Sequence, residues 1–153
     1  MSLDFNRFAE RGNEFLNTLA RELGYPNDKP RAGRVLTSIL HSLRRHLTTE
    51  ESIQVLAQFP MFLKAVYVAG WSTHQSQKKA RNTRELFLEI RDIHGPVSQN
   101  DFPSDEHLDK AVGVVFRLLG RYVSSGEFED LRAVLPKKLK AIIPLPSIPS
   151  QTP

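Results

Sequence analysis

The 153-residue chain contains no cysteine. Disulfides, thiolate nucleophiles and thiolate-ligated metal sites are therefore excluded, and a reducing, cytoplasmic setting is expected. Long apolar runs are missing as well, because no stretch approaches the roughly 18 apolar residues that a membrane span requires. The N-terminus alternates charged and apolar residues and has no signal-peptide core. We therefore expect a soluble protein with no membrane partner.

The familiar sequence signatures of chemistry are also missing. The chain has no G-x-S-x-G nucleophile elbow, no P-loop and no dinucleotide-binding glycine pattern. Its histidines show no metal-ligand spacing, and His41 and His46 are five positions apart, so they do not share a helix face. We predict that the protein is not an enzyme and has no catalytic residues, no metal site and no cofactor.

What the sequence does contain is an internal repeat. Residues 31–66 align without a gap on residues 107–142, and residues 14–24 match residues 85–95 just upstream. The identical pairs in the longer match are Leu43/Leu119, Arg45/Arg121, Glu51/Glu127, Ala57/Ala133, Pro60/Pro136, Leu63/Leu139, Lys64/Lys140 and Ala65/Ala141. A repeat of this length with helical periodicity indicates a tandem helical architecture.

Both segments of the longer match begin with a long amphipathic helix. Apolar residues recur at i, i+3, i+4, i+7, i+8, i+11 and i+15 within 32–47 and again within 108–123. Each helix stops at an S/T-x-x-E capping box, which begins at Thr48 in the first copy and at Ser124 in the second. A second, shorter helix is therefore predicted immediately after each long one.

Proline ends these shorter helices. A proline inside a helix removes a hydrogen bond and clashes with the preceding turn, whereas one at the helix start is tolerated. Pro60 and Pro136 therefore predict a fourth, short helix in each copy. The leading helices are expected over 3–24 and 82–95, and the Pro- and Asn-containing segment 96–107 is expected to be a loop.

These signals predict an all-α fold of two tandem, similar helical units of about four helices each, packed into one helical bundle with pseudo-two-fold symmetry. The units are expected at residues 1–69 and 82–143. A basic Gly-Trp linker, residues 70–81, joins them, and the Pro-rich tail 144–153 is expected to be disordered. Since neither apolar stripe can be buried alone, the units should share one core.

The order of these motifs resembles a known family. Two copies of a long helix, S/T-x-x-E, a short helix and F/L-P-x-x-L-K, joined by Gly-Trp, are similar to the bacterial domain-of-unknown-function family 2267. The residues that carry the likeness are Glu14-Phe15-Leu16, Gln58-Phe59-Pro60, Gly70-Trp71, Glu85-Leu86-Phe87 and Leu135-Pro136-Lys137-Lys138-Leu139. The resemblance covers nearly the whole chain except the tail. It implies a small, soluble, all-helical bacterial protein and brings no catalytic residues with it.

Charge is unevenly distributed along the chain. Residues 31–84 carry nine Lys/Arg and two Asp/Glu, a net charge of +7. Residues 85–109 carry one Lys/Arg and seven Asp/Glu, a net charge of −6. The two stretches could face each other, be solvated, or form an anion-binding surface. The candidate binding residues at the linker are Trp71, Lys78, Lys79, Arg81 and Arg84. Arg44, Arg45 and Lys64 are possible neighbours of this basic patch.

Three functions remain open. The leading hypothesis is a non-enzymatic interaction or regulatory module that binds a protein partner through a groove between the units or through the linker face. The alternative is nonspecific nucleic-acid binding through the basic patch. Residues 31–58 have a helix-turn-helix outline, but the second helix has no basic residue to read bases, so any binding should be to the phosphate backbone. The third is a small apolar ligand held between the helix pairs.

Structural roles are expected for two further side chains. Trp71 follows apolar residues at the boundary between the copies, so it is predicted to fill the seam between them, and an interface anchor is the functional alternative. His94 lies on the apolar face of its helix and is predicted to be a core histidine bonded to a nearby carbonyl group.

Overall fold

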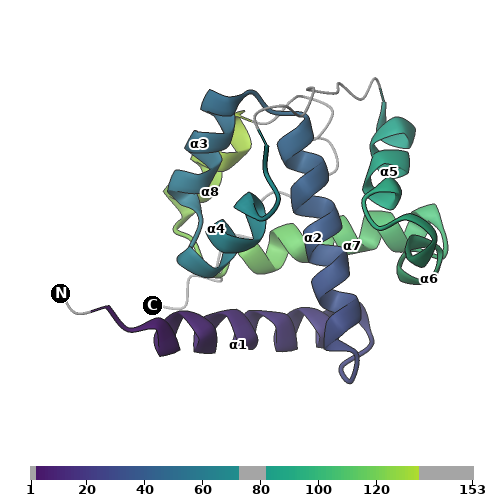
Figure 1. Cartoon of the computed structure of the whole chain (residues 1–153), viewed down its shortest axis with the longest axis horizontal. Coiled ribbons are helices and arrows are strands. Elements are labelled where there is room, and N and C mark those ends of the chain that lie inside the picture. Colours follow the sequence, from purple (N-terminus) through teal and green to yellow (C-terminus); the bar gives the residue numbers. More distant parts are fainter. Residues whose placement is uncertain (1–2, 73–81, 135–153) are drawn as a thin grey trace.

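The computed structural model describes residues 3–72 and 82–134, and every regular element in them is a helix (Figure 1). The first half contains α1 (Phe5–Leu23), α2 (Lys29–Arg45), α3 (Thr49–Gln58) and α4 (Met61–Val68). The second half contains α5 (Thr83–Asp92), the 3-10 turn η1 (Gly95–Val97), α6 (Ser98–Asp101), α7 (Asp105–Leu119) and α8 (Ser125–Val134). The predicted all-α fold is confirmed. The helix predicted after Pro136, the Pro-rich tail and most of the linker lie outside the described residues.

Both predicted capping boxes are present. The Thr48 amide donates to the Glu51 carboxylate at 2.8 Å, and the Glu51 amide donates to Thr48 Oγ1 at 3.1 Å. Ser124 and Glu127 make the same reciprocal pair at 2.8 and 3.0 Å. These bonds satisfy amides that have no partner within the helix. Each long helix is therefore followed by a sharp turn into a short one.

A left-handed glycine ends α1. Gly24 has φ 99°, and its amide donates to the carbonyl groups of Ala20 and Arg21. Four residues later, Asp28 starts α2 by accepting a bond from the Arg31 amide at 3.1 Å. The short connection turns the chain sharply, so α2 rises steeply from the end of α1 (Figure 1).

The helices of the two halves pack across one another. The first helix, α1, contacts α2, α4 and α7, while α5 contacts α2 and α3 contacts α8. Figure 1 shows α3 and α8 side by side at one end, with α5 and α6 at the other. The α1–α7 and α5–α2 pairs both join the leading helix of one half to the long central helix of the other. The pseudo-two-fold relation that would produce such an exchange stays a prediction.

One hydrophobic core serves both halves. Phe15 and Leu19 from the first half and Leu108, Leu119 and Phe128 from the second are at most 2% exposed, and they belong to one contiguous cluster. The side chains of α7 are buried over a wide arc, which includes Val114 as well as the main stripe. This shared core fixes the positions of α1, α2 and α4, which form the walls of the candidate site.

The segment predicted to be a loop, residues 96–107, contains helical turns instead. It includes most of η1, all of α6 and the start of α7, which Ser104 caps by accepting a bond from the His107 amide. Helical periodicity cannot reveal an element of four residues, because one turn is too short to show a repeat. The side chain of Asp101, at the end of α6, is held by α2 and accounts for the ordered turn.

Candidate functional site

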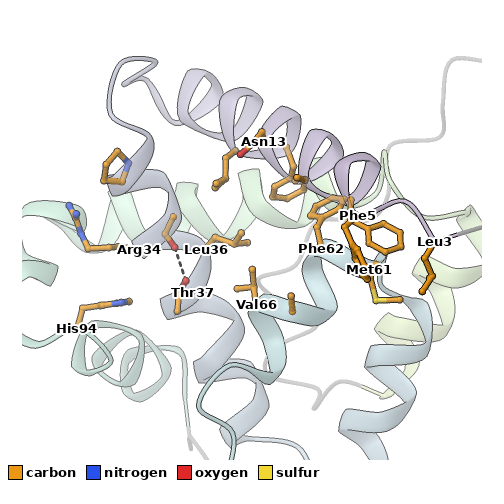
Figure 2. Close-up of a pocket in the computed structure, with 18 residues that line it drawn as sticks. Leu3, Phe5, Asn13, Arg34, Leu36, Thr37, Met61, Phe62, Val66 and His94 are labelled. Atoms are coloured by element: carbon orange, nitrogen blue, oxygen red, sulfur yellow. Dashed lines mark hydrogen bonds between the residues drawn. The ribbon is translucent and has the colours of Figure 1, made fainter.

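An apolar groove with a volume of about 920 Å³ lies between α1, α2 and α4 and is open on one side. Its size falls within the range of about 300–1,000 Å³ that is typical of ligand sites. Figure 2 shows Leu3, Phe5 and Met61 at one end of the groove and Arg34 and His94 at the other. Nearly all of the remaining lining is apolar. The groove therefore has an aromatic, solvent-exposed end and a polar end.

The outer wall is the N-terminal half of α1. Phe5, Phe8, Ala9 and Gly12 lie at i, i+3, i+4 and i+7, so they share one helix face. Further along the helix, this face enters the core, where Leu19 is fully buried. At the start of α1 the same face stays uncovered by the described residues, and Phe5 is 70% exposed. The amphipathic stripe of α1 is thus longer than the surface that covers it.

The inner wall is formed where α4 approaches α1. A Cβ atom added to Gly12 would lie 3.2 Å from Cβ of Phe62, so the absence of a side chain at position 12 permits this close approach. The Phe62 ring packs against Phe15 and Tyr122, with centroid distances of 5.4 and 5.5 Å. Aromatic pairs at such distances stabilise a packed cluster beyond their buried area alone. This wall is therefore rigidly connected to the core.

The α2 wall includes a glycine, Gly33, between larger lining residues such as Leu36. A Cβ atom added to Gly33 would meet nothing within 4 Å, so empty space lies beside it. Thr37 Oγ1 donates to the Gly33 carbonyl oxygen at 2.8 Å, and its hydroxyl group is therefore already used. The result is a recess along α2 into which a large apolar side chain of a ligand could fit.

The polar end is organised by an ion pair. Arg34 Nε and Nη2 donate to the two carboxylate oxygens of Asp101, both at 2.8 Å, and this pairing raises the pKa of Arg34. The Asp101 carboxylate is 1% exposed, whereas the Arg34 side chain is 35% exposed. Arg34 therefore anchors α6 with two N–H groups while part of its guanidinium still faces solvent.

His94 Nδ1 lies 2.6 Å from Ser38 Oγ. A hydroxyl–imidazole pair is the arrangement that activates serine nucleophiles. Ser38, however, is 1% exposed in the middle of α2, so its oxygen is inaccessible to a substrate. The contact instead ties α2 to the end of α5. The prediction of a carbonyl partner for His94 is wrong, because the packing of these helices places the Ser38 hydroxyl group against the ring.

The residues predicted at the linker are not brought together by the described structure. Trp71 is half-buried, and its ring lies 6.0 Å from the Tyr67 ring, within the first half of the chain. Its predicted role at the seam stays a prediction. Arg84 is exposed in the first turn of α5. The other members, Lys78, Lys79 and Arg81, lie outside the described residues.

Arg44 does not belong to a surface patch. It is 6% exposed, and its Nη1 donates to the carbonyl oxygens of Tyr67 and Ala69 at 2.7 and 2.8 Å. Carbonyl groups at a helix end have no partner within the helix, so Arg44 satisfies the end of α4. Burial lowers the pKa of Arg44. Nearby, burial raises the pKa of Tyr67 to about 12, and its hydroxyl group bonds to Ser52 Oγ at 2.8 Å.

Part of the basic stretch, residues 31–84, contacts the acidic stretch, residues 85–109. Besides the Arg34–Asp101 pair, Arg31 donates to the Asn100 carbonyl oxygen at 2.8 Å, and the His46 ring contacts the Glu89 carboxylate. These contacts join α2 to α5 and α6. Several of the basic side chains on α2 therefore bind partners within the fold.

The position of the groove differs from the one predicted. A groove was expected between the two units, but this one is formed by three helices of the first half, with His94 as the contribution from the second. The available signal was the apolar face at the start of α1, which continues beyond the part that the core requires. In residues 3–72 and 82–134, no group of three or more His, Asp or Glu side chains is placed to hold a metal ion. No helix in these residues is both long and apolar enough to cross a membrane.

The fold and the groove define a class: a small protein whose described residues form helices and an open apolar groove. Residues 12–142 match the family described as uncharacterized conserved protein (DUF2267), and the chain belongs to this family. The family predicted from the motif order is thereby confirmed. The match begins at Gly12, so the exposed start of α1 precedes it. No curated protein matches the chain.

Proposed function

We propose that the protein is a non-enzymatic interaction module that binds an amphipathic helix of a partner protein in the groove between α1, α2 and α4. The observation that carries the proposal is the groove itself, with the exposed side chains of Leu3, Phe5 and Met61 at its open end. A contiguous apolar surface on a folded protein commonly marks a binding site, since its exposure to water is unfavourable.

The open shape of the groove favours a helix as the ligand. An amphipathic helix needs burial along one face only, and its anchoring side chains recur at i, i+3, i+4 and i+7. A small apolar molecule, by contrast, usually has most of its surface enclosed by the protein. The groove also combines a flexible side chain, Met61, with the recess beside Gly33, which accommodates anchors of different sizes.

The polar groups near the groove support binding rather than catalysis. Two N–H groups of Arg34 bind Asp101, and the Ser38 oxygen is inaccessible. A reaction would require a nucleophile or general base within reach of a bound substrate. The arrangement of His94 and Arg34 is better suited to orienting a polar group of the ligand at one end of an apolar interface.

A peptide selection with a groove-filled variant tests the proposal. Helical peptides displayed on phage are selected on the wild-type protein and depleted on Gly33→Leu, whose side chain enters the recess beside α2 without a backbone clash. Gly113→Leu in α7 is the matched control. A new Cβ atom there also meets nothing within 4 Å, and position 113 does not line the groove.

The selected peptides should carry an apolar stripe at helical spacing. They should bind Gly113→Leu as tightly as the wild type and Gly33→Leu roughly tenfold more weakly or worse, the scale of losing one interface anchor. Failure to find any peptide that distinguishes the two leucine variants would contradict the proposal. Saturable, Gly33→Leu-sensitive binding of dodecanoate without any such peptide would instead favour the small apolar ligand.

Nonspecific nucleic-acid binding remains the second candidate, and the exposure of Arg84 beside the basic linker sequence is the observation that favours it. The internal contacts of Arg44 and Arg34 reduce the charge available to such a surface. Titration with duplex DNA and RNA at two salt concentrations tests it. Binding that weakens steeply with salt would support phosphate contacts, and no binding at low salt would exclude them.

A further inference from the structure

We infer that the helix that occupies the groove is the exposed start of α1 from a second copy of this chain, so that two copies cover each other's grooves. The inference rests on the proposed function, because it names the occupant of the same groove. Its support comes from the shape, the amphipathic character and the charge of the described residues.

The surface has both protruding and recessed parts. In a two-fold dimer the same patch meets itself, so it must contain side chains that protrude and space to receive them. Leu3, Phe5 and Met61 protrude, with exposures of 77%, 70% and 50%. The recess lies beside Gly33, and the small side chain of Ala65 also lines the groove. One copy therefore offers the large side chains that the other can accommodate.

The start of α1 is the kind of helix that suits this groove. Phe5 and Phe8 are one turn apart, and their rings pack edge to face at 6.1 Å. Arg7 and Glu10, on the other side of the helix, are exposed and do not line the groove. Docking would therefore bury the aromatic face while the charged face stays in water.

The charges in the groove also fit this occupant. Arg34 is the one Lys or Arg among the lining residues, and none of these residues is Asp or Glu. Asp4 lies between Leu3 and Phe5 in the sequence and is exposed, so a docked copy brings a carboxylate together with its two apolar side chains. A guanidinium has five N–H donors, of which Asp101 engages two, and the others remain able to bind a second carboxylate.

Sedimentation velocity of the full chain over a concentration series tests the inference. The wild type and Gly113→Leu should convert from monomer to dimer as the concentration rises. Phe5→Ser removes a protruding side chain and Gly33→Leu fills the recess, so each should weaken dimerisation roughly tenfold or more. Far-UV circular dichroism checks that each variant keeps its helices.

Asp4→Asn tests the charge separately from the fold. Asp4 is the N-cap of α1, and its Oδ1 accepts a bond from the Asn6 amide at 3.1 Å. Asparagine is an equally good N-cap but carries no charge. We expect this variant to dimerise severalfold more weakly than the wild type at low salt, and the difference to shrink at high salt.

A synthetic peptide of residues 1–14 provides the direct probe. It should bind the wild type and dissociate the dimer, and it should bind Gly33→Leu much more weakly. A wild-type chain that stays monomeric throughout, or a dimer unaffected by Phe5→Ser and Gly33→Leu, overturns the inference. The proposed function is tested separately. A chain that stays monomeric but still binds selected helical peptides in its groove would contradict the dimer and leave the proposed function standing. A chain with no groove-dependent peptide binding would contradict both.

Discussion

Along α2, several buried or half-buried polar side chains bond to other parts of the chain. Arg44 reaches the end of α4, Ser38 meets His94, and His41 Nε2 donates to the Val66 carbonyl oxygen at 2.8 Å. Buried polar groups are costly unless they are hydrogen-bonded, so each contact fixes the position of its partner. The polar residues of α2 thus position α4 and α5 as definitely as its apolar stripe positions α1.

His41 makes the fold sensitive to acid. Burial lowers its pKa below the ordinary value of 6.5, although the bond to Val66 acts in the opposite direction. The neutral ring therefore stabilises the fold fully above about pH 6.5, and this stability is lost as the pH falls, because the unfolded chain binds the proton more readily. His41→Gln keeps an N–H donor for the Val66 carbonyl but cannot titrate.

Urea unfolding at about pH 7.5 and about pH 5 measures the effect of His41. The free energy of unfolding should fall more in the wild type than in His41→Gln, because the other titrating groups are common to both. Equal losses in the two proteins would show that protonation of His41 is not coupled to unfolding.

At the scale of elements, the Asp101 carboxylate is the buried ionic contact between α6 and α2. Asp101→Ala removes both bonds to Arg34 and should lower the free energy of unfolding by about 1.5–3 kcal/mol, the range for hydrogen bonds to charged groups. The partial exposure of Arg34 keeps the expected loss below that of a fully buried pair. Amide hydrogen exchange should accelerate in α6 before it does in α2.

Asp105→Ala is the matched control for this ion pair. Asp105 also pairs with an arginine, Arg91, but its side chain is 64% exposed, so its removal should cost at most about 1 kcal/mol. If both variants are equally destabilised, burial of Asp101 is not what holds α6 in place.

The helices with capping and periodicity signals were predictable, and the short turns were not. Thr48 and Glu51 lie in a motif whose geometry is local, so the sequence alone indicates the start of α3. The position of α6 depends on contacts such as the bond between Arg34 and Asp101, which are 67 positions apart. Periodicity carries no information about such a contact, because it reports which positions are apolar and not which polar residues meet.

At the scale of the whole molecule, the shared core predicts a single unfolding transition. Leu119 is 1% exposed within the cluster that contains residues of both halves. Leu119→Asp places an unpaired charge there, which costs several kcal/mol. Trp71, the one tryptophan of the chain, belongs to the first half, so its fluorescence reports on that half while far-UV circular dichroism reports on all helices.

Both signals should be lost together in Leu119→Asp, whereas Leu119→Met, which nearly conserves volume, should cost less than about 1.5 kcal/mol. Native Trp71 fluorescence in a chain that has lost about half its helical signal would show that the halves fold independently, and the shared core would then be wrong.

The candidate site was predictable only in part at this scale. An apolar face at the start of α1 can be read from Phe5 and Phe8. Whether that face is covered depends on how far α2 and α4 extend over it, and this follows from the helix packing rather than from the residues of α1. The basic patch was predicted incorrectly for a related reason. Arginine is usually a surface residue, but the packing of the helices buries Arg44.

The contacts of Arg44 also determine how the molecule transmits tension. The chain leaves α4 at Ala69, whose carbonyl oxygen is held by Arg44 on α2. A force that draws the second half away through the connecting segment is therefore passed to the central helix and not to the eight-residue helix α4 alone. Because α2 also packs against α5 and α7, the covalent joint and the core resist separation of the halves at the same helix.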